Sequence, residues 1–552
     1  MKTKTSHGFT GSGMKTQILD ETRRRCGVHA PCTPERGAAG VLPPVSRAAR
    51  PCVEPPPSGL GNSTVQPGTQ TVSSKVDFTG RRIHFIGSGG IGVSALMELC
   101  RDRGALVTGC DSGCGGQVES LRAKGYPVET THSPAHVAAC DEVVHTAALD
   151  GMHPEVLAAR ITGKAISTRM HMLGQIARGT RAICITGTHG KTTTTWLIAN
   201  LLLQAERDPS ILVGGVVKAL GGNARCGQGA EFVAEVDESD NRLHEVVPTL
   251  PVITNIDYDH LENYGGSIDA LEMAMERFLR SVDTSDPCAA LLGCGDDLRV
   301  RRALQRAGRA SGRPVFAYGH GPACDVTFQR LRPLPCASET TGRPPASEPS
   351  SLGWVFDAHG PFGVWRDIEL PMPGKHNVLN ALAALTAGWR LGVPADCIRE
   401  ALAHTERVGR RFEIKGVKRG VRVVDDYGHH PTEIAATLQA ARDTTQGRLA
   451  VLFQPHRYTR TAKLLQEFAS CFAAADLVCL LPIYAASEKP IAGVTHKALA
   501  KAIAERGQQV LAFDTRPDAV AHLLGWACEN DTVVTQGAGD VTRASDELVS
   551  GL

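Results

Sequence analysis

Gly187-Thr188-His189-Gly190-Lys191-Thr192-Thr193 is the stretch of sequence that decides the fold. It follows the short apolar run 182–185 and precedes the apolar run 196–203, so we expect a strand, a glycine-rich turn and a helix. In such a turn the backbone N–H groups and the positive end of the helix dipole face one point, which suits a phosphate group. The stretch therefore predicts a phosphate-binding site at the end of a strand in an α/β domain.

Two side chains of this loop add charge and metal chemistry. Lys191 supplies a positive charge for the outer phosphates of a nucleotide, and the Thr192 hydroxyl is placed to hold Mg²⁺. The loop departs from the usual P-loop, because two residues separate its glycines instead of four and residue 185 is Ile. A glycine and threonine turn without a ligand remains an alternative at this point.

Length and composition indicate several domains and exclude some classes of partner. A chain of 552 residues is too long for one hydrophobic core. Its 42% hydrophobic and 21% charged residues are typical of soluble globular proteins, and no apolar run reaches the roughly 18 residues of a membrane span. The formal net charge of +2 gives no reason to expect a nucleic acid or a membrane as partner.

The 17 cysteines are scattered and include no C-x-x-C pair. This pattern favours reduced thiols in a cytoplasmic protein over a disulfide scaffold or a zinc site. Cys110 and Cys114 form the closest pair outside the N-terminal segment, but the loop around them lacks further ligands.

Two segments are expected to lie outside the packed domains. Residues 1–76 are rich in Pro, Gly, Ser and Thr without apolar periodicity, which predicts a disordered extension. No apolar stretch follows its three consecutive arginines, so we expect no signal peptide. A native start near Val76 is the alternative, because no Met lies between Met14 and Met97. The Pro-, Ser- and Thr-rich segment 336–351 is predicted to be a surface loop.

A second glycine-rich loop opens the first domain. Gly87-Ser88-Gly89-Gly90-Ile91-Gly92 follows a short strand pattern and precedes a helix pattern, and it matches the dinucleotide-binding fingerprint. Asp111 follows a second strand, at about the distance expected of a ribose contact. A nicotinamide- or flavin-dependent dehydrogenase is one interpretation, although the same loop binds any pyrophosphate.

Polar side chains gather where further strands are expected to end. The run 232–240 leads into Glu235, Asp237 and Asp240, and the run 251–260 ends at His260. Ligands collect at the carboxyl ends of parallel strands, and carboxylates beside a triphosphate normally bind Mg²⁺. A solvated acidic turn is the alternative for Asp237 and Asp240.

The C-terminal half carries one further helix start and a third domain. Asn377 and Asn380 lie on one face of the helix expected there, where they bind a nucleotide or simply cap the helix. Three later units consist of a strand followed by a polar turn, which predicts a third doubly wound domain; they are 422–431, 449–460 and 531–540. His, Arg and Asp side chains on these turns suit a carboxylate and an amine.

The ordered set of these blocks resembles the Mur ligase family over roughly residues 78–550. The blocks that carry the resemblance are 187–193, 235–240, 254–260, 374–384, 410–412, 425–431 and 453–461. The resemblance implies an α/β protein of three domains: a Rossmann-like UDP-sugar-binding domain at 77–178, a central P-loop-type ATP-binding domain at 179–408 with the shortened loop, and a Rossmann-like domain at 409–552 that brings the amino acid and closes over ATP.

The resemblance also implies an activity. Within the family, the blocks are most similar to those of enzymes that use ATP and Mg²⁺ to join L-alanine to the lactyl carboxylate of UDP-N-acetylmuramate. Such an enzyme is expected to be a cytoplasmic monomer or weak dimer in peptidoglycan precursor synthesis. One alternative attaches a recycled tripeptide to the same sugar, but that group tends to read Asp-Phe-Ala where this chain has Asp426-Tyr427-Gly428. A P-loop phosphotransferase or a nucleotide sensor is a more remote alternative.

Site residues are carried over from the family motifs by position. The catalytic set implied is Lys191, Glu235, His260, Arg411 and Asp426. The implied ATP-binding set is Gly187, Thr188, His189, Gly190, Lys191, Thr192, Thr193, Asn377 and Asn380. The implied UDP-sugar-binding set is Gly87, Gly89, Gly90, Gly92 and Asp111.

Two smaller sets complete the expectation. Thr192 and Glu235 are expected to hold one Mg²⁺ and His260 a second one. Arg411 and Asp426 are expected to close over the phosphates and the adenosine. The amino-acid pocket is expected to contain His429, His430, Arg457 and Arg460.

Overall fold

The computed structural model of the chain describes residues 75–113, 116–146, 149, 151–335, 352–486 and 488–552. The chain divides into two units, Met1–Thr69 and Gln70–Leu552, and the described residues all belong to the second. The expected extension 1–76, apart from its last two residues, and the expected surface loop 336–351 lie outside the described residues.

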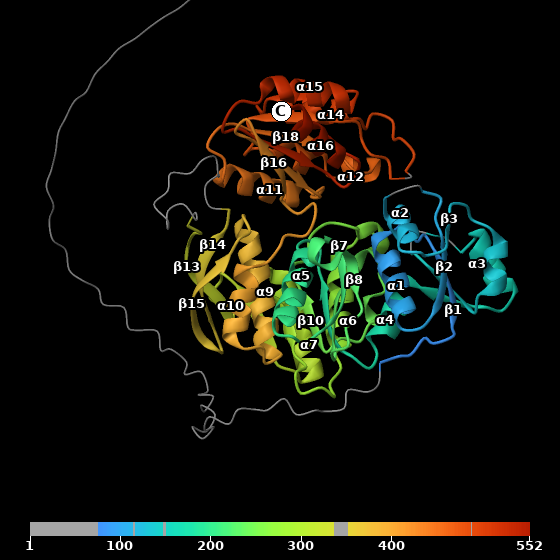
Figure 1. Cartoon of the computed structure of the whole chain (residues 1–552). Helices are drawn as coiled ribbons and strands as arrows, with labels where there is room; N and C mark the ends of the chain where they lie inside the picture. The colour runs from blue at the N-terminus through green and yellow to red at the C-terminus, as the bar shows by residue number, and fades with distance from the viewer. Residues whose placement is uncertain (1–74, 114–115, 147–148, 150, 336–351, 487) are drawn as a thin grey trace, which may run out of the picture. The chain divides into compact units, whose positions relative to one another are not determined.

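The first sheet contains five parallel strands in the order β3-β2-β1-β4-β5 (Figure 1). Its strands are β1 (Arg82–Ile86), β2 (Leu106–Cys110), β3 (Val128–Glu129), β4 (Glu142–His145) and β5 (Ala165–Thr168). Its helices are α1 (Ile91–Asp102), α2 (Gly116–Ala123), α3 (Pro154–Ile161), α4 (Arg169–Ala177) and the short 3-10 helix η1 (Pro134–Ala139). Side chains alternate along β1, so that Ile83 and Phe85 pack on the α1 side while Ile86 packs with Val156 of α3.

The central sheet has ten strands in the order β15-β14-β13-β12-β11-β10-β6-β9-β7-β8. The strands are β6 (Arg181–Thr186), β7 (Ser210–Val217), β8 (Gly222–Arg225), β9 (Glu231–Glu235), β10 (Leu250–Ile253), β11 (Leu291–Cys294), β12 (Val315–Gly319), β13 (Val326–Pro333), β14 (Trp354–Gly360) and β15 (Gly363–Leu370). The helices packed on it are α5 (Lys191–Gln204), α6 (Ile268–Arg280), α7 (Leu298–Ser311), α9 (Lys375–Arg390) and α10 (Ala395–Ala403).

The position of β6 explains where the central site lies. β6 pairs in parallel with β9 on one side and β10 on the other, so the carboxyl ends of three strands meet at one edge. The phosphate loop follows β6, Thr254 follows β10, and Glu235 is the last residue of β9. Parallel strand order therefore brings together blocks that are far apart in the sequence.

The third sheet has six strands in the order β16-β17-β21-β18-β19-β20. The strands are β16 (Glu413–Lys418), β17 (Val421–Asp426), β18 (Leu449–Phe453), β19 (Leu477–Leu480), β20 (Val510–Ala512) and β21 (Thr532–Gln536). The helices are α11 (Pro431–Asp443), α12 (Tyr458–Lys463), α13 (Leu465–Ser470), α14 (His496–Ala504), α15 (Arg516–Trp526) and α16 (Thr542–Gly551). Only β16 runs antiparallel to its neighbour, and apolar cores cover both faces of the sheet.

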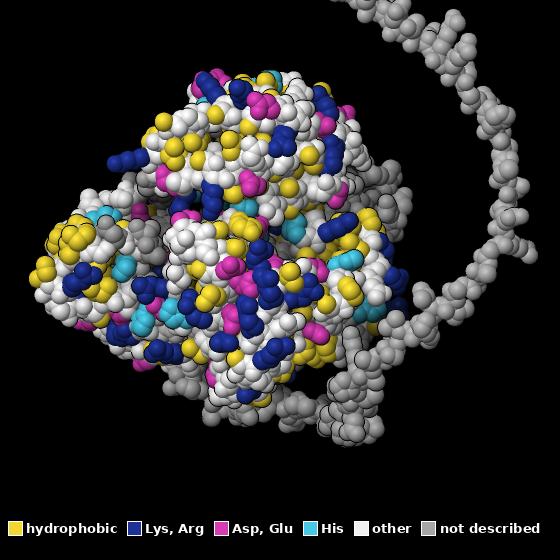
Figure 2. Space-filling view, turned by 180° about the vertical axis from the view of Figure 1, so that it is seen from behind, with side chains coloured by type: hydrophobic (Ala, Val, Ile, Leu, Met, Phe, Trp, Pro, Cys, Tyr) yellow, Lys and Arg dark blue, Asp and Glu magenta, His cyan; other side chains and the backbone are white. Residues whose placement is uncertain are grey.

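The predicted α/β fold with three sheets is confirmed, whereas the domain boundaries at 178/179 and 408/409 stay predictions. Among the described residues, no helix is both long and apolar enough to cross a membrane. Basic and acidic side chains are interspersed on the face shown in Figure 2, in keeping with the small net charge.

Candidate active site

The phosphate loop has a backbone that only glycine supports at two positions. Gly187 and Gly190 have φ angles of 126° and 80°. A Cβ atom on Gly187 would lie 2.3 Å from the Thr254 hydroxyl, and one on Gly190 would lie 2.7 Å from the Asn380 side-chain oxygen. Since α5 begins directly after Gly190, the shortened loop still aims the helix N-terminus into the site.

Lys191 is held inside the loop by three acceptors. Its Nζ donates to the carbonyl oxygens of Gly187 (2.7 Å) and Thr188 (3.2 Å) and to Glu238 Oε2 (2.7 Å). Burial lowers the pKa of Lys191, but the neighbouring Glu238, Asp237 and Glu235 carboxylates outweigh this and raise it above its usual value. The ammonium is therefore charged and positioned before any nucleotide arrives.

Glu238 is a functional residue that the sequence analysis missed, although it lies inside the quoted acidic run. Its side chain is fully buried, and its Oε1 atom has no hydrogen-bond partner among the described residues. Burial raises the pKa of its carboxyl, opposed by Lys191. A carboxylate in this position restrains the Lys191 ammonium and leaves one oxygen for a further partner.

Thr192 and Glu235 are brought together as predicted for a magnesium site. The Thr192 hydroxyl donates to Glu235 Oε1 at 3.2 Å, and the Gly214 N–H donates to Glu235 Oε2 at 2.7 Å. Arg411 of the third sheet's domain also donates to the Thr192 hydroxyl at 3.3 Å. A hydroxyl and a carboxylate beside a phosphate loop are the hard oxygen donors that Mg²⁺ takes, so the residues fit this ion.

The structure places Asp237 and Asp240 in a different role. The Arg169 guanidinium of α4 pairs with Asp237 (3.2 Å) and with Asp240 (2.6 Å). A Cβ atom on Gly92 would lie 2.6 Å from the same guanidinium. These two carboxylates thus form an ion-pair network that reaches the first glycine loop, and the sequence carried no signal for Arg169.

His260 lies with acidic neighbours of its own. It has a left-handed backbone (φ 53°), and its ring nitrogens are 3.6 Å from Asp259 and 3.8 Å from Glu262. Burial lowers its pKa, but Glu262 and Asp259 outweigh burial and raise it. The second Mg²⁺ at His260 stays a prediction.

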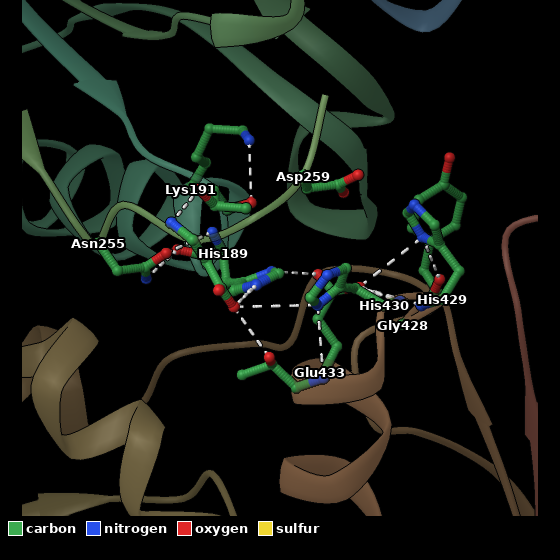
Figure 3. A network of polar contacts seen from close by, with 12 residues as sticks. His189, Lys191, Asn255, Asp259, Gly428, His429, His430 and Glu433 are labelled. Carbon is green, nitrogen blue, oxygen red and sulfur yellow. Dashed lines mark hydrogen bonds and ion pairs between the residues drawn. The ribbon is translucent and has the colours of Figure 1, made fainter. Parts of the chain in front are cut away.

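His189 connects the phosphate loop to α11. Its Nε2 lies 3.0 Å from Asp257 Oδ2, and its Nδ1 lies 3.3 Å from Glu433 Oε1. Figure 3 shows the His189 side chain between loops of the central sheet and residues at the start of α11. The ring centroids of His189 and His430 are 4.9 Å apart. Burial lowers the pKa of His189, but Asp257 and Glu433 outweigh it and raise the pKa to about 9. Glu433 was not identified from the sequence.

This ion pair makes the stability of the ligand-free protein depend on pH. Because the folded-state pKa of His189 is raised, its contribution is complete below about pH 6.5 and is lost as the pH rises through about 9. We expect the melting temperature of the ligand-free parent to fall more steeply through that interval than the melting temperature of His189→Gln. The matched control is His244→Gln, an exposed histidine of the same domain. Equal pH profiles for the parent and His189→Gln would contradict the assignment.

A cavity of about 460 Å³ adjoins the phosphate loop. Its lining includes the predicted nucleotide-binding residues His189, Gly190, Thr193, Asn377, Asn380, Arg411 and Asp426. Asn377 donates to the Pro373 carbonyl (2.6 Å) and Asn380 donates to Asn377 Oδ1 (3.0 Å). Both asparagines line the cavity and bond within the start of α9, where no side chain caps the helix, and their contact with a nucleotide stays a prediction.

Asp426 holds the loop that carries Arg411. Its carboxylate accepts hydrogen bonds from the N–H groups of Phe412 and Gly428 (both 2.8 Å) and from the Thr437 hydroxyl (3.1 Å). Burial raises the pKa of this carboxyl, and Arg411 opposes the shift. The structure therefore gives Asp426 a positioning role; its predicted contact with the nucleotide stays a prediction.

Asp111 is tied to the first glycine loop. Its carboxylate accepts from the N–H groups of Gly89 and Gly113, both at 2.8 Å. The Cys110 carbonyl accepts from the N–H groups of Gly87 (2.9 Å) and Ser88 (3.1 Å). These contacts fix a turn that includes Gly87, Gly89, Gly90 and Gly92; their predicted contact with a UDP sugar, and that of Asp111, stays a prediction.

The predicted amino-acid pocket is only partly assembled. Arg457, Arg460 and His260 line one cavity of about 300 Å³, and Arg460 pairs with Asp259 at 3.0 Å. His429 and His430 are outside this lining. Burial and then Arg460 lower the pKa of His429 to about 3, while the His430 Nδ1 accepts the Thr432 N–H and caps α11.

Three family models match the chain, and each one covers the region of one sheet. They are "Mur ligase family, catalytic domain" at residues 82–181, "Mur ligase middle domain" at 185–388 and "Mur ligase, glutamate ligase domain" at 410–539. UDP-N-acetylmuramate–L-alanine ligase of Allorhizobium ampelinum is 38% identical over 478 residues, which cover 85% of this chain and 96% of that protein.

Two further comparisons agree. The ligase of the same name from Trichlorobacter lovleyi is 39% identical over 473 residues, covering 85% of this chain and 99% of that protein. The crystal structure of UDP-N-acetylmuramate-alanine ligase from Thermotoga maritima superposes with a TM-score of 0.70 at 27% identity, covering 85% of this chain and 98% of that one. With this identity over nearly the full length of its relatives, the chain belongs to the Mur ligase family.

Proposed function

We propose that the chain is an ATP-dependent ligase that joins L-alanine to the lactyl carboxylate of UDP-N-acetylmuramate and releases ADP and phosphate. The observation that carries the proposal is the 38% identity to ligases of that name over 85% of the chain. The site supports the proposal, because three features lie together: the Lys191 charge in the phosphate loop, the Thr192 and Glu235 oxygens that suit Mg²⁺, and the Arg411 guanidinium. The reaction is a cytoplasmic step of peptidoglycan precursor synthesis, on which cell shape and division depend.

The chemistry starts from a carboxylate, which has no good leaving group. A lactyl carboxylate oxygen attacks the γ-phosphorus of ATP, ADP leaves, and a mixed acyl phosphate forms. The alanine amine then adds to the acyl carbon, and phosphate leaves from the tetrahedral intermediate with the former carboxylate oxygen. Each step creates or moves negative charge, so catalysis depends on cations that are already in position.

The side chains divide these tasks. Lys191 neutralises the phosphoryl group during transfer, and its charge is secured in advance by Glu238. Thr192 and Glu235 would hold Mg²⁺, which screens the phosphate oxygens of the nucleotide. Arg411 supplies a second protein cation from the other domain, at 3.3 Å from the Thr192 hydroxyl.

The amine must reach the acyl carbon in its neutral form. His429 and His456 are both held uncharged, since burial and neighbouring arginines lower their pKa values to about 3 and about 4. Neutral imidazoles beside Arg460 can accept hydrogen bonds from an incoming ammonium and so orient it, although their lowered pKa values make them poor bases, while the arginine suits its carboxylate. Selection of alanine by this region is part of the proposal.

The test is a set of phosphate-release assays in which one substrate at a time is omitted. The proposal predicts release only when ATP, Mg²⁺, UDP-N-acetylmuramate and L-alanine are all present, together with the amide product by mass spectrometry. Release that needs the sugar nucleotide and a tripeptide but not L-alanine would identify the tripeptide ligase instead. Release without either acceptor would indicate a phosphotransferase or a nucleotide sensor. Parallel assays with L-serine and glycine would define the selectivity.

A further inference from the structure

A cluster of imidazole, thiol and carboxylate groups lies in the first domain, on the α3 side of its sheet. Glu155, in the first turn of α3, is fully buried and lies at the centre of this cluster. His84 of β1, Cys110 at the end of β2 and His136 of η1 surround it. His132 and His153 contact the opposite oxygen of the same carboxylate, at 3.5 and 4.0 Å. None of these residues takes part in the proposed ligation.

The polar atoms of this cluster converge on one point. Glu155 Oε1 lies 2.7 Å from His136 Nδ1 and 3.8 Å from His84 Nε2, and Cys110 Sγ lies 3.0 Å from Glu155 Oε2. One ligand atom from each of the four residues lies within 4.8 Å of all the others. A tetrahedral zinc site separates its ligand atoms by about 3.3–3.7 Å, so shifts of under about 1 Å would complete it.

His84 is the residue that points to a missing partner. Its ring is 1% exposed, and its Nδ1 is hydrogen-bonded to the Thr108 hydroxyl at 2.8 Å. Its Nε2 is buried, faces Glu155, and has no hydrogen-bond partner among the described residues. A buried ring nitrogen without a partner is costly, and an imidazole oriented through its other nitrogen is the usual arrangement of a metal ligand.

The contacts of the cluster point the same way. Cys110 Sγ lies 3.0 Å from Glu155 Oε2, and the Ser133 N–H donates to Glu155 Oε1 at 2.9 Å, so a thiol and a buried carboxylate face each other. A divalent cation would neutralise the carboxylate and convert the thiol into a thiolate, leaving no net charge in the buried site.

We propose that His84 Nε2, Cys110 Sγ, His136 Nδ1 and the Glu155 carboxylate form a structural site for a zinc-class divalent cation. Mixed nitrogen, sulfur and oxygen ligands in a closed set of four select Zn²⁺ over Mg²⁺, which prefers oxygen. Binding exchanges the thiol proton for a metal–sulfur bond, so each ion bound releases one proton to solvent from Cys110. Any proton held by an imidazole of the set would be released as well.

A surface hollow adjoins the proposed site, and an ion bound there would affect the first glycine loop. A hollow of about 400 Å³ is lined by Thr108 and His136 and adjoins the cluster from the surface. The Cys110 carbonyl accepts hydrogen bonds from the N–H groups of Gly87 and Ser88, so the residue that supplies the proposed sulfur ligand also holds the start of the first glycine loop. A bound ion would therefore stiffen this loop and raise the melting temperature of the protein.

The cysteine spacing predicts no zinc site, and the proposed site differs from the pattern on which that expectation depends. The usual signature depends on pairs of ligands close in sequence, such as C-x-x-C. These four ligands come from β1, β2, η1 and α3, and each element contributes only one of them. Only the folded sheet brings them to one point.

The test uses Co²⁺ as a spectroscopic substitute for Zn²⁺ on the full-length, metal-stripped protein. Excess Mg²⁺ is present to occupy the oxygen sites. We expect one Co²⁺ per chain, strong tetrahedral d–d bands, a thiolate-to-cobalt charge-transfer band, and complete displacement by one equivalent of Zn²⁺. Zinc should also raise the melting temperature. Absence of tight binding, or binding without the sulfur band, would overturn the proposal.

Variants separate this site from an adventitious one. Cys110→Ser should lose the sulfur band and weaken zinc binding by about 10²-fold or more, and His136→Gln, at a partly exposed ligand, should weaken it by about 10-fold or more. The matched control is Cys140→Ser, a buried cysteine of the same domain whose thiol donates to the Val137 carbonyl. A sulfur band retained in Cys110→Ser, or lost equally in Cys140→Ser, would contradict the assignment. Melting curves of the metal-free variants show whether each one is folded.

Discussion

Replacement of Lys191 by alanine lowers the rate of ligation by about 10²–10³-fold or more, because one positioned cation is lost from a developing phosphoryl charge. The effect should appear in kcat more than in KM, since the charge develops only during transfer. The measurement is steady-state phosphate release with all substrates. The matched control is Lys218→Ala, an exposed lysine of the same domain, which should retain parental turnover.

A second variant separates catalysis from folding in this experiment. Lys191→Ala leaves the Glu238 carboxylate buried without its cation, which lowers stability unless that carboxyl takes up a proton. The double variant Lys191→Ala/Glu238→Gln removes the unpaired charge and should recover the melting temperature but not the activity. Near-parental turnover in either variant would remove Lys191 from its assigned role.

Replacement of Glu235 by glutamine should lower kcat by about 10²-fold or more and raise the Mg²⁺ concentration needed for half-maximal rate. Glutamine removes the charge and keeps one oxygen, so it can accept from the Thr192 hydroxyl or from the Gly214 N–H but not from both. A titration of rate against Mg²⁺ checks this. Glu206→Gln, at an exposed carboxylate after α5, is the control and should leave the titration unchanged. An unaltered Mg²⁺ requirement in Glu235→Gln would rule out Glu235 as the ligand.

The parts of the site that were predictable from sequence are those in which the chemistry is local. The phosphate loop, with Gly190 and Lys191, is a continuous run between a strand and a helix, and the structure forms both elements there. The family resemblance implied that Thr192 and Glu235 hold one Mg²⁺ together, and their side chains are 3.2 Å apart. Strand order by itself predicted only that polar side chains gather at the carboxyl ends of parallel strands, which meet at one edge of the sheet.

The site residues that the sequence did not reveal form ion pairs whose partners are determined by packing in the folded chain. The sequence left Asp237 and Asp240 open between a metal site and a solvated acidic turn, and in the structure both pair with Arg169 of the first domain. Glu238, beside them in the same run, is the residue that restrains Lys191. The sequence alone does not distinguish these three carboxylates of one short turn, and the direction of each side chain after β9 decides among them.

Contacts between residues of different domains are equally hard to predict from the sequence. Nothing near His189 in the sequence indicates that Glu433 of α11 lies 3.3 Å from its ring. Asp426 was expected from the resemblance to close over the nucleotide, which stays a prediction. In the structure its carboxylate accepts from the N–H groups of Phe412 and Gly428 and from the Thr437 hydroxyl. Sequence identified which residues are chemically unusual, and the structure is needed to show what each of them touches.

The most direct test of the central claim follows oxygen through the reaction. UDP-N-acetylmuramate labelled with ¹⁸O in its lactyl carboxylate is incubated with the protein, ATP, Mg²⁺ and L-alanine, and the released phosphate is analysed by mass spectrometry. Ligation through an acyl phosphate transfers one carboxylate oxygen to each phosphate and leaves the other in the amide, so we predict one labelled oxygen per phosphate released. Phosphate without label, formed in amounts matching ADP, would mean that ATP is hydrolysed without activation of the carboxylate and would contradict the account.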